Sequence, residues 1–328
     1  MARVFSGIQP TGRKHLGNLV GAIRHWVADQ DEPGCVYCIV DLHSITVPRD
    51  PDELRSSTLD TAALLLAAGI DPERSTFFVQ SHVAEHAQLA WLLNCVATMG
   101  ELGRMVQFKE KSKGQESVLV GLFDYPVLQA ADVLLYGARR VPVGEDQRQH
   151  LELMRDVAMR FNGRFGQTFV VPEASIPPVG ARVVDLQAPE RKMSTTGTSD
   201  AGTLYLLDPP GTLRKKVMSA VTDSEASVRA DPSKPGVTGL LDLLGAVTDT
   251  PVPALEERYA GAGYGALKKD VAEAVIAALE PIQRRHAELI ADVGELQRIL
   301  RLGAEQARAQ AAPTLERARA AMGFVAPG

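Results

Sequence analysis

The stretch VFSGIQPTGRKHLGN, residues 4–18, decides the fold, because it joins a strand pattern to the start of a helix. Val4–Ile8 is rich in β-branched and aromatic residues and predicts a strand. The segment Gln9-Pro10-Thr11-Gly12 supplies turn residues, and we expect a helix from about Asn18 to Asp29. Ligands of parallel sheets bind beyond the carboxyl ends of the strands, so Gln9 lies at a candidate binding edge.

The same alternation of short strand patterns and amphipathic helix patterns continues through the first 180 residues. One helix start is marked by its capping residues: Asp50 can cap, Pro51 suits the first position, and Glu53 can complete a capping box. We expect further strands at 36–47, 76–80 and 140–143, and helices at 50–68, 86–96, 128–136 and 145–162. The alternation predicts an α/β fold, a Rossmann-type doubly wound parallel sheet covered on both faces.

The chain has 328 residues, more than one domain usually contains, and its pattern changes past the middle. Residues 172–180 are rich in proline and form a candidate boundary. After Lys215 the pattern is helical, with a loop at 231–236 and long helices at 268–289 and 295–322. We therefore expect a sheet domain over residues 1–185 and a smaller all-helical C-terminal domain within residues 186–328.

Composition excludes several classes of protein. The net charge of −5 does not indicate a nucleic-acid binder by bulk electrostatics, although local basic patches leave RNA open. No apolar run reaches membrane-spanning length and the N-terminus lacks a signal-peptide pattern, so we expect a cytoplasmic protein with neither membrane nor DNA as a partner. Cys35 and Cys38 have no second pair to complete a zinc site, and we expect both to be buried in a strand.

The tetrad His15-Leu16-Gly17-Asn18 lies where a helix begins. Free backbone N–H groups and the positive end of the helix dipole favour phosphate oxygens there, and Gly17 allows an adenine ring to approach closely. For the tetrad taken alone, an ordinary N-terminal turn with a capping Asn is the favoured explanation. Farther along, Lys192-Met193-Ser194 suits a loop that grips pyrophosphate as negative charge develops, but the same pattern is also typical of a solvated loop.

Three other features carry candidate chemistry. Asp132 lies in an apolar helix pattern, where a carboxylate is costly to bury without a donor partner. The helix start Gly144-Glu145-Asp146-Gln147 follows a predicted strand and can bind ribose hydroxyls and an amino group, or simply cap its helix. The lysines at 109–113 form either a solvated charged face or a second source of charge for a triphosphate. Gln9, His43, Gln80 and Gly144 all fall at predicted carboxyl ends of strands.

Taken in order, the motifs form a longer series. They are FSGIQPTG (5–12), HLGN (15–18), DLH (41–43), QFKEKS (107–112), YP (125–126), AAD (130–132), VPVGEDQ (141–147), KMS (192–194) and SAVTDSE (219–225). The series closely resembles the bacterial tryptophanyl-tRNA synthetases, which are class I aminoacyl-tRNA synthetases. The likeness runs from about residue 3 to the C-terminal helices, so it is far more specific than any single motif.

The resemblance implies an enzyme that joins L-tryptophan and ATP into tryptophanyl-adenylate and pyrophosphate, and then transfers tryptophan to the 3′ end of tRNA(Trp). It implies a homodimer, ATP with Mg²⁺ as a substrate, no tightly bound cofactor and no metal-ligating residue. Residues 1–185 would be the catalytic domain, and 186–328 would hold the KMS loop and the anticodon-binding helices. The basic clusters 214–216, 268–269 and 284–285 are candidates for the anticodon path, although solvated helix faces are the default for each.

The resemblance also assigns residues by position. Asp132 would accept the indole N–H of tryptophan, and Gln9, Lys111 and Lys192 would be catalytic, the two lysines facing the phosphates. The tryptophan-binding residues would be Phe5, Gly7, His43, Tyr125, Gln129, Asp132, Val141, Val143 and Gln147. The ATP-binding residues would be Gln9, Pro10, Thr11, Gly17, Asn18, Gly144, Glu145, Asp146, Val183, Lys192, Met193, Ser194, Thr195 and Thr196.

Two departures from the family pattern stand out. Thr195 occupies the place of the second lysine of the Lys-Met-Ser-Lys-Ser loop, so either Lys111 compensates or activation is slower. Gln129 replaces an apolar residue expected beside the indole, which predicts a changed response to tryptophan analogues.

Three alternatives to the tryptophan enzyme remain. A non-catalytic paralogue that binds tryptophan or tRNA for regulation is favoured by Thr195 and disfavoured by the intact pocket residues. A tyrosyl-tRNA synthetase shares the fold but is disfavoured by the context of residues 144–147. A nicotinamide-dependent enzyme is remote, because no G-x-G-x-x-G follows the first strand.

Overall fold

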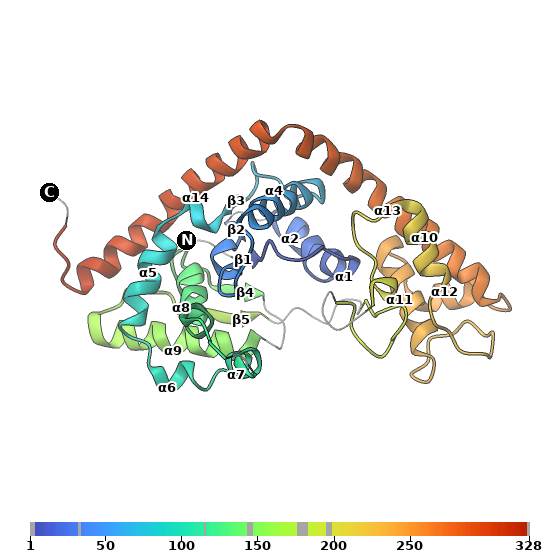
Figure 1. The fold of residues 1–328 in the computed structure, drawn as a ribbon, viewed down its shortest axis with the longest axis horizontal. Helices are drawn as coiled ribbons and strands as arrows, with labels where there is room; N and C mark the ends of the chain where they lie inside the picture. The colour runs from blue at the N-terminus through green and yellow to red at the C-terminus, as the bar shows by residue number, and fades with distance from the viewer. Residues whose placement is uncertain are drawn as a thin grey trace.

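A five-stranded parallel sheet forms the centre of the protein (Figure 1), as seen in a computed structural model that describes residues 4–31, 34–114, 116–142, 147–175, 183–194 and 199–326. The strand order is β3-β2-β1-β4-β5, and neighbouring strands are parallel throughout. The strands are β1 (Val4–Ile8), β2 (Cys35–Ile39), β3 (Thr76–Val79), β4 (Arg140–Pro142) and β5 (Glu173–Ser175). The chain winds outward from β1 in one direction and then in the other, which confirms the expected doubly wound fold.

Helices connect the strands in the first half of the chain. They are α1 (Leu16–Asn18), α2 (Arg24–Asp29), α3 (Asp41–Ser44), α4 (Pro51–Ala67), α5 (Glu85–Asn94), α6 (Met99–Leu102), α7 (Val106–Ser112), α8 (Val120–Leu134) and α9 (Arg148–Phe165). The helix expected from Asn18 begins earlier, at Leu16, and its middle, Leu19–Ile23, is π-helical between α1 and α2. Asp50 caps α4 as expected, accepting hydrogen bonds from the backbone N–H groups of Asp52 and Glu53.

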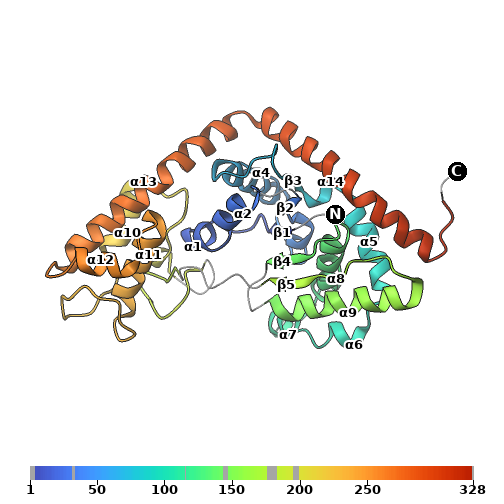
Figure 2. The same ribbon diagram turned by 180° about the vertical axis from the view of Figure 1, so that it is seen from behind.

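The second half of the chain is helical. After a short 3₁₀ turn at Asp200–Gly202, it forms α10 (Pro210–Met218), α11 (Pro235–Thr248), α12 (Val252–Arg258), α13 (Tyr264–Ala291) and α14 (Val293–Ala321). Helices α13 and α14 arch over the sheet, and α10 to α12 gather at one end of the molecule, as both views show (Figures 1 and 2). Helix α14 returns to the sheet and packs against β3 and α5.

The strand β2 explains why two separate cores form. All five of its residues are buried, as is typical of a central parallel strand. Successive side chains point to opposite faces, so Cys35 and Tyr37 enter one apolar cluster while Val36 and Cys38 enter the other. Both cysteines are therefore buried strand residues, as expected, and burial raises the pKa of the Cys38 thiol, with Asp132 and Asp41 adding to the effect.

Some expected bounds of helices and strands differ in the structure: the helix expected at 128–136 is the later part of α8, which begins at Val120. The strand expected at 36–47 ends at Ile39, because the chain turns into α3 at Asp41. Side chains from the end of β3 hold this turn: Gln80 Oε1 accepts the backbone N–H of Leu42 at 3.1 Å. The proline-rich segment at 172–180, expected as a candidate boundary, begins with β5, whose pairing with β4 extends the sheet. Among the described residues, no helix is long and apolar enough to cross a membrane.

Candidate active site

Polar side chains gather beyond the carboxyl ends of three neighbouring strands, as the sequence predicts. Gln9 follows β1, His43 lies in α3 just after β2, and Gln80 follows β3 directly. Gln80 is fully buried and His43 nearly so, which places both beneath the surface of this edge. The fourth candidate, Gly144, lies outside the described residues, as do Val143, Glu145, Asp146, Thr195 and Thr196.

Hydrogen bonds bring together the two motifs that lie far apart in the sequence. The N–H of Leu16 donates to the carbonyl of Leu204 at 2.8 Å, and the N–H of Leu206 donates to the carbonyl of Lys14 at 2.9 Å. The N–H of Met193 donates to the carbonyl of Val183 at 3.0 Å, and Thr203 Oγ1 donates to the carbonyl of Ser194 at 3.1 Å. The segment 203–206 therefore lies between the HLGN and KMS motifs and is bonded to both.

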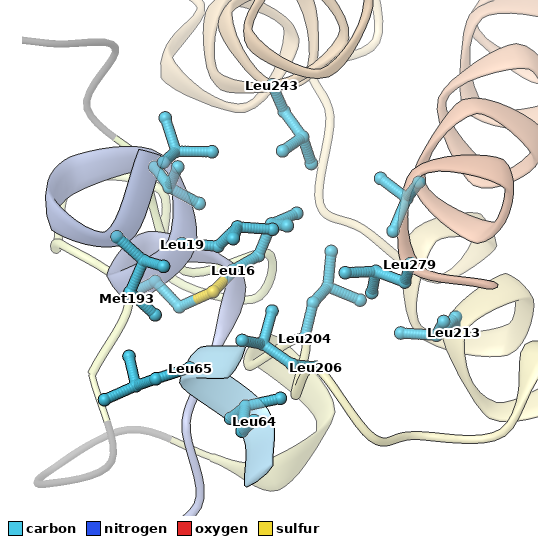
Figure 3. Close-up of a cluster of buried hydrophobic side chains, with 14 of the residues drawn as sticks. Leu16, Leu19, Leu64, Leu65, Met193, Leu204, Leu206, Leu213, Leu243 and Leu279 are labelled. Atoms are coloured by element: carbon cyan, nitrogen blue, oxygen red, sulfur yellow. The ribbon is translucent and has the colours of Figure 1, made fainter. Parts of the chain in front are cut away.

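An apolar cluster lies behind these bonds. Met193 is almost fully buried in the same cluster as Leu16 and Leu19 of the HLGN helix. Figure 3 shows these side chains beside Leu204 and Leu206, with leucines from α4, α10, α11 and α13 around them. The middle residue of the KMS motif is thus a core residue, and the lysine and serine on either side are held at the surface by its burial.

His15 and Gly17 fit together closely. A Cβ on Gly17 would lie 2.9 Å from His15 Nδ1 and 3.8 Å from Val183 Cβ, so the glycine leaves room for the His15 ring. Burial lowers the pKa of His15 to about 4, and the charges of Lys192 and Lys14 add to the effect. His15 is therefore a neutral ring close to two lysines. The side chain of Asn18 accepts the backbone N–H of His15 at 2.9 Å, which closes the first helical turn.

Lys14 is a site residue that the sequence interpretation missed. Its Nζ donates to the backbone carbonyls of Gln9, Thr11 and Gly12 at 2.9, 2.8 and 3.3 Å. Burial lowers its pKa to about 8, although Asp60 opposes the shift. The ammonium group fixes the turn that carries Gln9 and Thr11, and a lysine directly before the tetrad was the only signal available in the sequence.

Asp132 has three hydrogen-bond donors around it. Its side chain is 2% exposed. Oδ1 accepts from Gln80 Nε2 at 2.7 Å and from His86 Nδ1 at 2.7 Å, and Oδ2 pairs with His43 Nε2 at 2.9 Å. Burial alone would raise the pKa of Asp132, but the hydrogen bonds from His43 and His86 outweigh burial and hold the pKa below its usual range. The free-energy cost of burying this carboxylate is therefore offset by hydrogen bonds from His43, His86 and Gln80.

Asp132 is connected through His43 to Tyr125, another of the implied tryptophan-binding residues. The rings of His43 and Tyr125 meet edge to face, with centroids 6.2 Å apart. The hydroxyl of Tyr125 lies 3.1 Å from Gln107 Oε1 and 2.7 Å from His150 Nε2, and burial raises its pKa to about 12. Lys111 Nζ lies 5.6 Å from the centre of the Tyr125 ring, so this predicted phosphate lysine belongs to the same neighbourhood.

The remaining predicted tryptophan-binding residues in the described part of the chain lie on β1, β4 and α8 and just before α9. Phe5 is buried on β1 and stacks on Tyr136 with ring centroids 5.5 Å apart. A Cβ on Gly7 would lie 2.8 Å from Val40 Cγ1, so the side chain of Val40, just after β2, occupies the space beside Gly7. Val141 is buried on β4, and Gln129 and Gln147 are half-buried on α8 and just before α9.

Part of the basic surface considered for the anticodon path is buried. Lys216 Nζ donates to the carbonyl of Thr203 at 2.8 Å and pairs with Asp208 at 2.9 Å beneath the surface. The guanidinium of Arg13 also pairs with Asp208, and it lies 3.8 Å from the centre of the Tyr205 ring. Lys216 therefore supports the segment after the KMS motif, and we correct its assignment as a surface cation. Lys268 is similarly bonded to the carbonyl of Ala220, at 2.7 Å.

A doubly wound parallel sheet with an HLGN helix start after its first strand, joined to a distant KMS segment, defines the class I aminoacyl-tRNA synthetases. The comparisons agree. The family model described as tRNA synthetases class I (W and Y) matches residues 1–280. This chain belongs to that family.

Individual relatives cover nearly the whole chain. The tryptophan–tRNA ligase of Caldanaerobacter subterraneus subsp. tengcongensis is 52% identical over 99% of each chain. Tryptophan–tRNA ligase 2 of Streptomyces avermitilis is 54% identical over 98% of this chain and 97% of its own. Among solved structures, the tryptophanyl-tRNA synthetase of Campylobacter jejuni complexed with ADP and tryptophan superposes with a TM-score of 0.87, at 34% identity over 98% of this chain and 100% of that one.

Proposed function

We propose that this protein is a tryptophan–tRNA ligase. It activates L-tryptophan with ATP, giving tryptophanyl-adenylate and pyrophosphate, and then transfers the tryptophyl group to the 3′ end of tRNA(Trp). The observation that carries the proposal is the buried Asp132 carboxylate held ionised by His43, His86 and Gln80 beyond the strand ends. Tryptophan–tRNA ligases that are more than half identical over almost the full chain support the same assignment.

In the first step the nucleophile is the carboxylate of the amino acid, so the protein supplies alignment and charge stabilisation. The turn at Gln9–Gly12, fixed by Lys14, and the helix start at His15–Asn18 receive ATP, with Val183 beside the adenine. Lys192 and Lys111 offset the charge that develops on the phosphates. Mg²⁺ arrives with ATP as part of that substrate.

The amino acid is recognised at the other end of the site. Its indole N–H donates to Asp132, while Tyr125 and Gln147 hold its polar end and Phe5, Gly7 and Val141 shape the ring pocket. Phenylalanine has no donor for Asp132. Sites built to hydrogen-bond one substrate group reject analogues that lack it by roughly 10⁴–10⁵.

The test is amino-acid-dependent ATP–pyrophosphate exchange, with tryptophan, tyrosine and phenylalanine each supplied alone. We expect exchange with tryptophan only. Exchange driven by tyrosine would replace the proposal with a tyrosyl-tRNA synthetase. Tryptophan binding without any exchange would instead support a non-catalytic paralogue, the alternative that Thr195 favours by removing a loop lysine.

We also propose that the enzyme works as a homodimer. Trp91 on α5, Met99 on α6 and Val120 on α8 are 68, 75 and 79% exposed, and both α5 and α6 pack against α8. Large apolar side chains gathered on adjoining helices are typical of an interface. Light scattering should give twice the mass of one chain. Trp91→Glu should lower the measured mass toward that of the monomer, whereas the control Met159→Glu, at an exposed position of α9, should leave the mass unchanged.

For tRNA we propose the exposed cations Lys215 on α10 and Lys269 and Arg284 on α13 as part of the anticodon path. Reversing the charge of Lys215 and Lys269 together should raise the KM for tRNA and leave ATP–pyrophosphate exchange unchanged. An unchanged KM for tRNA would remove them from the path. The division of the chain at residue 185 and a cytoplasmic location, where tRNA is charged, stay proposals of the same kind.

A further inference from the structure

The Asp132 carboxylate has a limited number of acceptor positions. An ionised carboxylate offers about four lone-pair positions, two on each oxygen. Gln80 and His86 occupy both positions on Oδ1, and His43 occupies one on Oδ2. Among the residues that the structure describes, no other donor reaches the carboxylate, so one acceptor position is left, on Oδ2 beside His43.

The donors are themselves held by a second row of contacts. His86 Nε2 lies at hydrogen-bond distance, 2.9 Å, from the hydroxyl of Tyr136, while the Nδ1–H of the same ring donates to Asp132. The oxygen of the Gln80 amide accepts the backbone N–H of Leu42, which turns its NH₂ group toward Asp132. Gln80, His86 and Tyr136 are all buried, so water does not compete for these bonds.

Tyr136 has two separate roles. Its ring stacks on Phe5 with an interplanar angle of 14°, and its hydroxyl bonds to His86. The ring therefore supports a wall of the pocket, whereas the hydroxyl acts on Asp132 through His86. Removing the hydroxyl alone separates these two roles, because phenylalanine keeps the stacked ring.

We propose that Gln80, His86 and Tyr136 are positioning residues that select the amino acid by leaving Asp132 a single acceptor, on Oδ2, for a group that donates and does not accept. The inference rests on the proposed function. An indole N–H is such a group, since it has no lone pair to satisfy. A phenol hydroxyl donates but also needs a donor of its own, and the N–H groups of His43 and His86 that face the carboxylate are already used.

The experiment compares tryptophan with its benzothiophene analogue, in which sulfur replaces the indole N–H. Both kcat/KM in ATP–pyrophosphate exchange and Kd are measured for each ligand. For each quantity, the ratio of the tryptophan value to the analogue value reports on the N–H alone, and this ratio is the preference for tryptophan. In Tyr136→Phe we expect the preference for tryptophan to fall by about three- to tenfold, and in His86→Leu by about tenfold or more, as expected for weakening a hydrogen bond to a charged group. His86→Asn, which keeps an N–H near the Nδ1 position, should retain more of the preference than His86→Leu.

Tyr37→Phe is the matched control. Tyr37 is also buried, also stacks on an aromatic ring, and donates its hydroxyl to the carbonyl of Trp26 at 2.7 Å, but in the other apolar cluster. Its loss should leave the preference for tryptophan unchanged. Thermal unfolding checks that each variant is folded, and Tyr136→Phe decides the matter where His86→Leu does not fold.

The outcomes separate the two proposals. If Tyr136→Phe and His86→Leu weaken tryptophan and its analogue by the same factor, the residues are merely structural and the inference is overturned. If the unchanged protein catalyses no exchange with tryptophan, the proposed function fails, and the Kd ratios still test the inference on binding alone. If the unchanged protein binds neither ligand, both proposals fall.

Discussion

The two ends of the candidate site solve the problem of burial in opposite ways. At the HLGN end, burial lowers the pKa values of the bases Lys14 and His15, and the charge of Asp60 opposes the shift of Lys14 without reversing it. At the Asp132 end, burial acts against the acid, but hydrogen bonds from His43 and His86 overcome it and the carboxylate stays ionised. At neutral pH the HLGN end therefore holds a neutral His15 ring beside a charged Lys14, whereas the Asp132 end holds a fixed negative charge.

The ends also differ in how they are built. Hydrogen bonds to backbone carbonyls join distant segments at the phosphate end, and Met193 packs behind them. Side-chain bonds among residues at the ends of strands and on α5 and α8 form the recognition end. Changes at the first end should therefore act on ATP, and changes at the second on tryptophan.

The largest expected effect comes from Asp132→Asn. The amide presents an NH₂ group to donors that now face the carboxylate, so at least one buried N–H loses its acceptor. We expect the free energy of unfolding to fall by about 3 kcal/mol and kcat/KM for tryptophan by roughly 100-fold or more. Urea unfolding and ATP–pyrophosphate exchange measure the two, and a KM for ATP raised as much as that for tryptophan would contradict the separation of the ends.

Met193→Ala should be next in size. It opens a cavity among Leu16, Leu19 and Leu204, and we expect a loss of about 2–4 kcal/mol in the free energy of unfolding together with a higher KM for ATP. The matched control is Met159→Ala, because Met159 is exposed on α9 and its truncation should change stability by less than about 0.5 kcal/mol. A change confined to the KM for tryptophan would show that the KMS segment supports the recognition end and not the phosphate end.

The smallest effect is a pH dependence at His15. Its folded pKa of about 4 lies below the unfolded value of 6.5, so the unfolded chain takes up the proton first as pH falls. His15 therefore contributes stability that is fully present above pH 6.5 and is lost as pH falls toward 4. Between pH 7 and pH 5 the natural protein should lose about 2 kcal/mol more than His15→Asn. Parallel urea titrations at both pH values would reveal equal losses if His15 were not buried as a neutral ring.

Much of the fold could be predicted because its signals are local. The strands at 4–8 and 76–80 and the capped helix after Asp50 depend on patterns within a few residues, and the structure confirms them. The end of β2 could not be predicted, since the turn into α3 is held by Gln80, whose amide reaches Leu42 across 38 positions of sequence.

The candidate site divides in the same way. Asp132 could be singled out because a carboxylate in an apolar helix needs a partner, but His86, 46 positions away, carries no local mark of being that partner. Lys14 was missed because three carbonyls in one turn become a binding site for its ammonium only when the turn is folded. The placement of Lys192 and Ser194, by contrast, depends on the burial of Met193 between them. No sequence pattern around Met193 indicates that it is buried.

The packing of α14 on β3 has a consequence for how the protein is made. β3 is the outer strand of its sheet, and a Cβ on Gly303 of α14 would lie only 1.7 Å from the carbonyl oxygen of Phe77, so the helix backbone lies directly on the strand (Figure 2). An uncovered outer strand is a template for pairing with another chain. β3 leaves the ribosome long before α14, so the nascent chain has an outer strand with unpaired backbone groups through most of its synthesis. Gly303 belongs to the helix that covers this strand last.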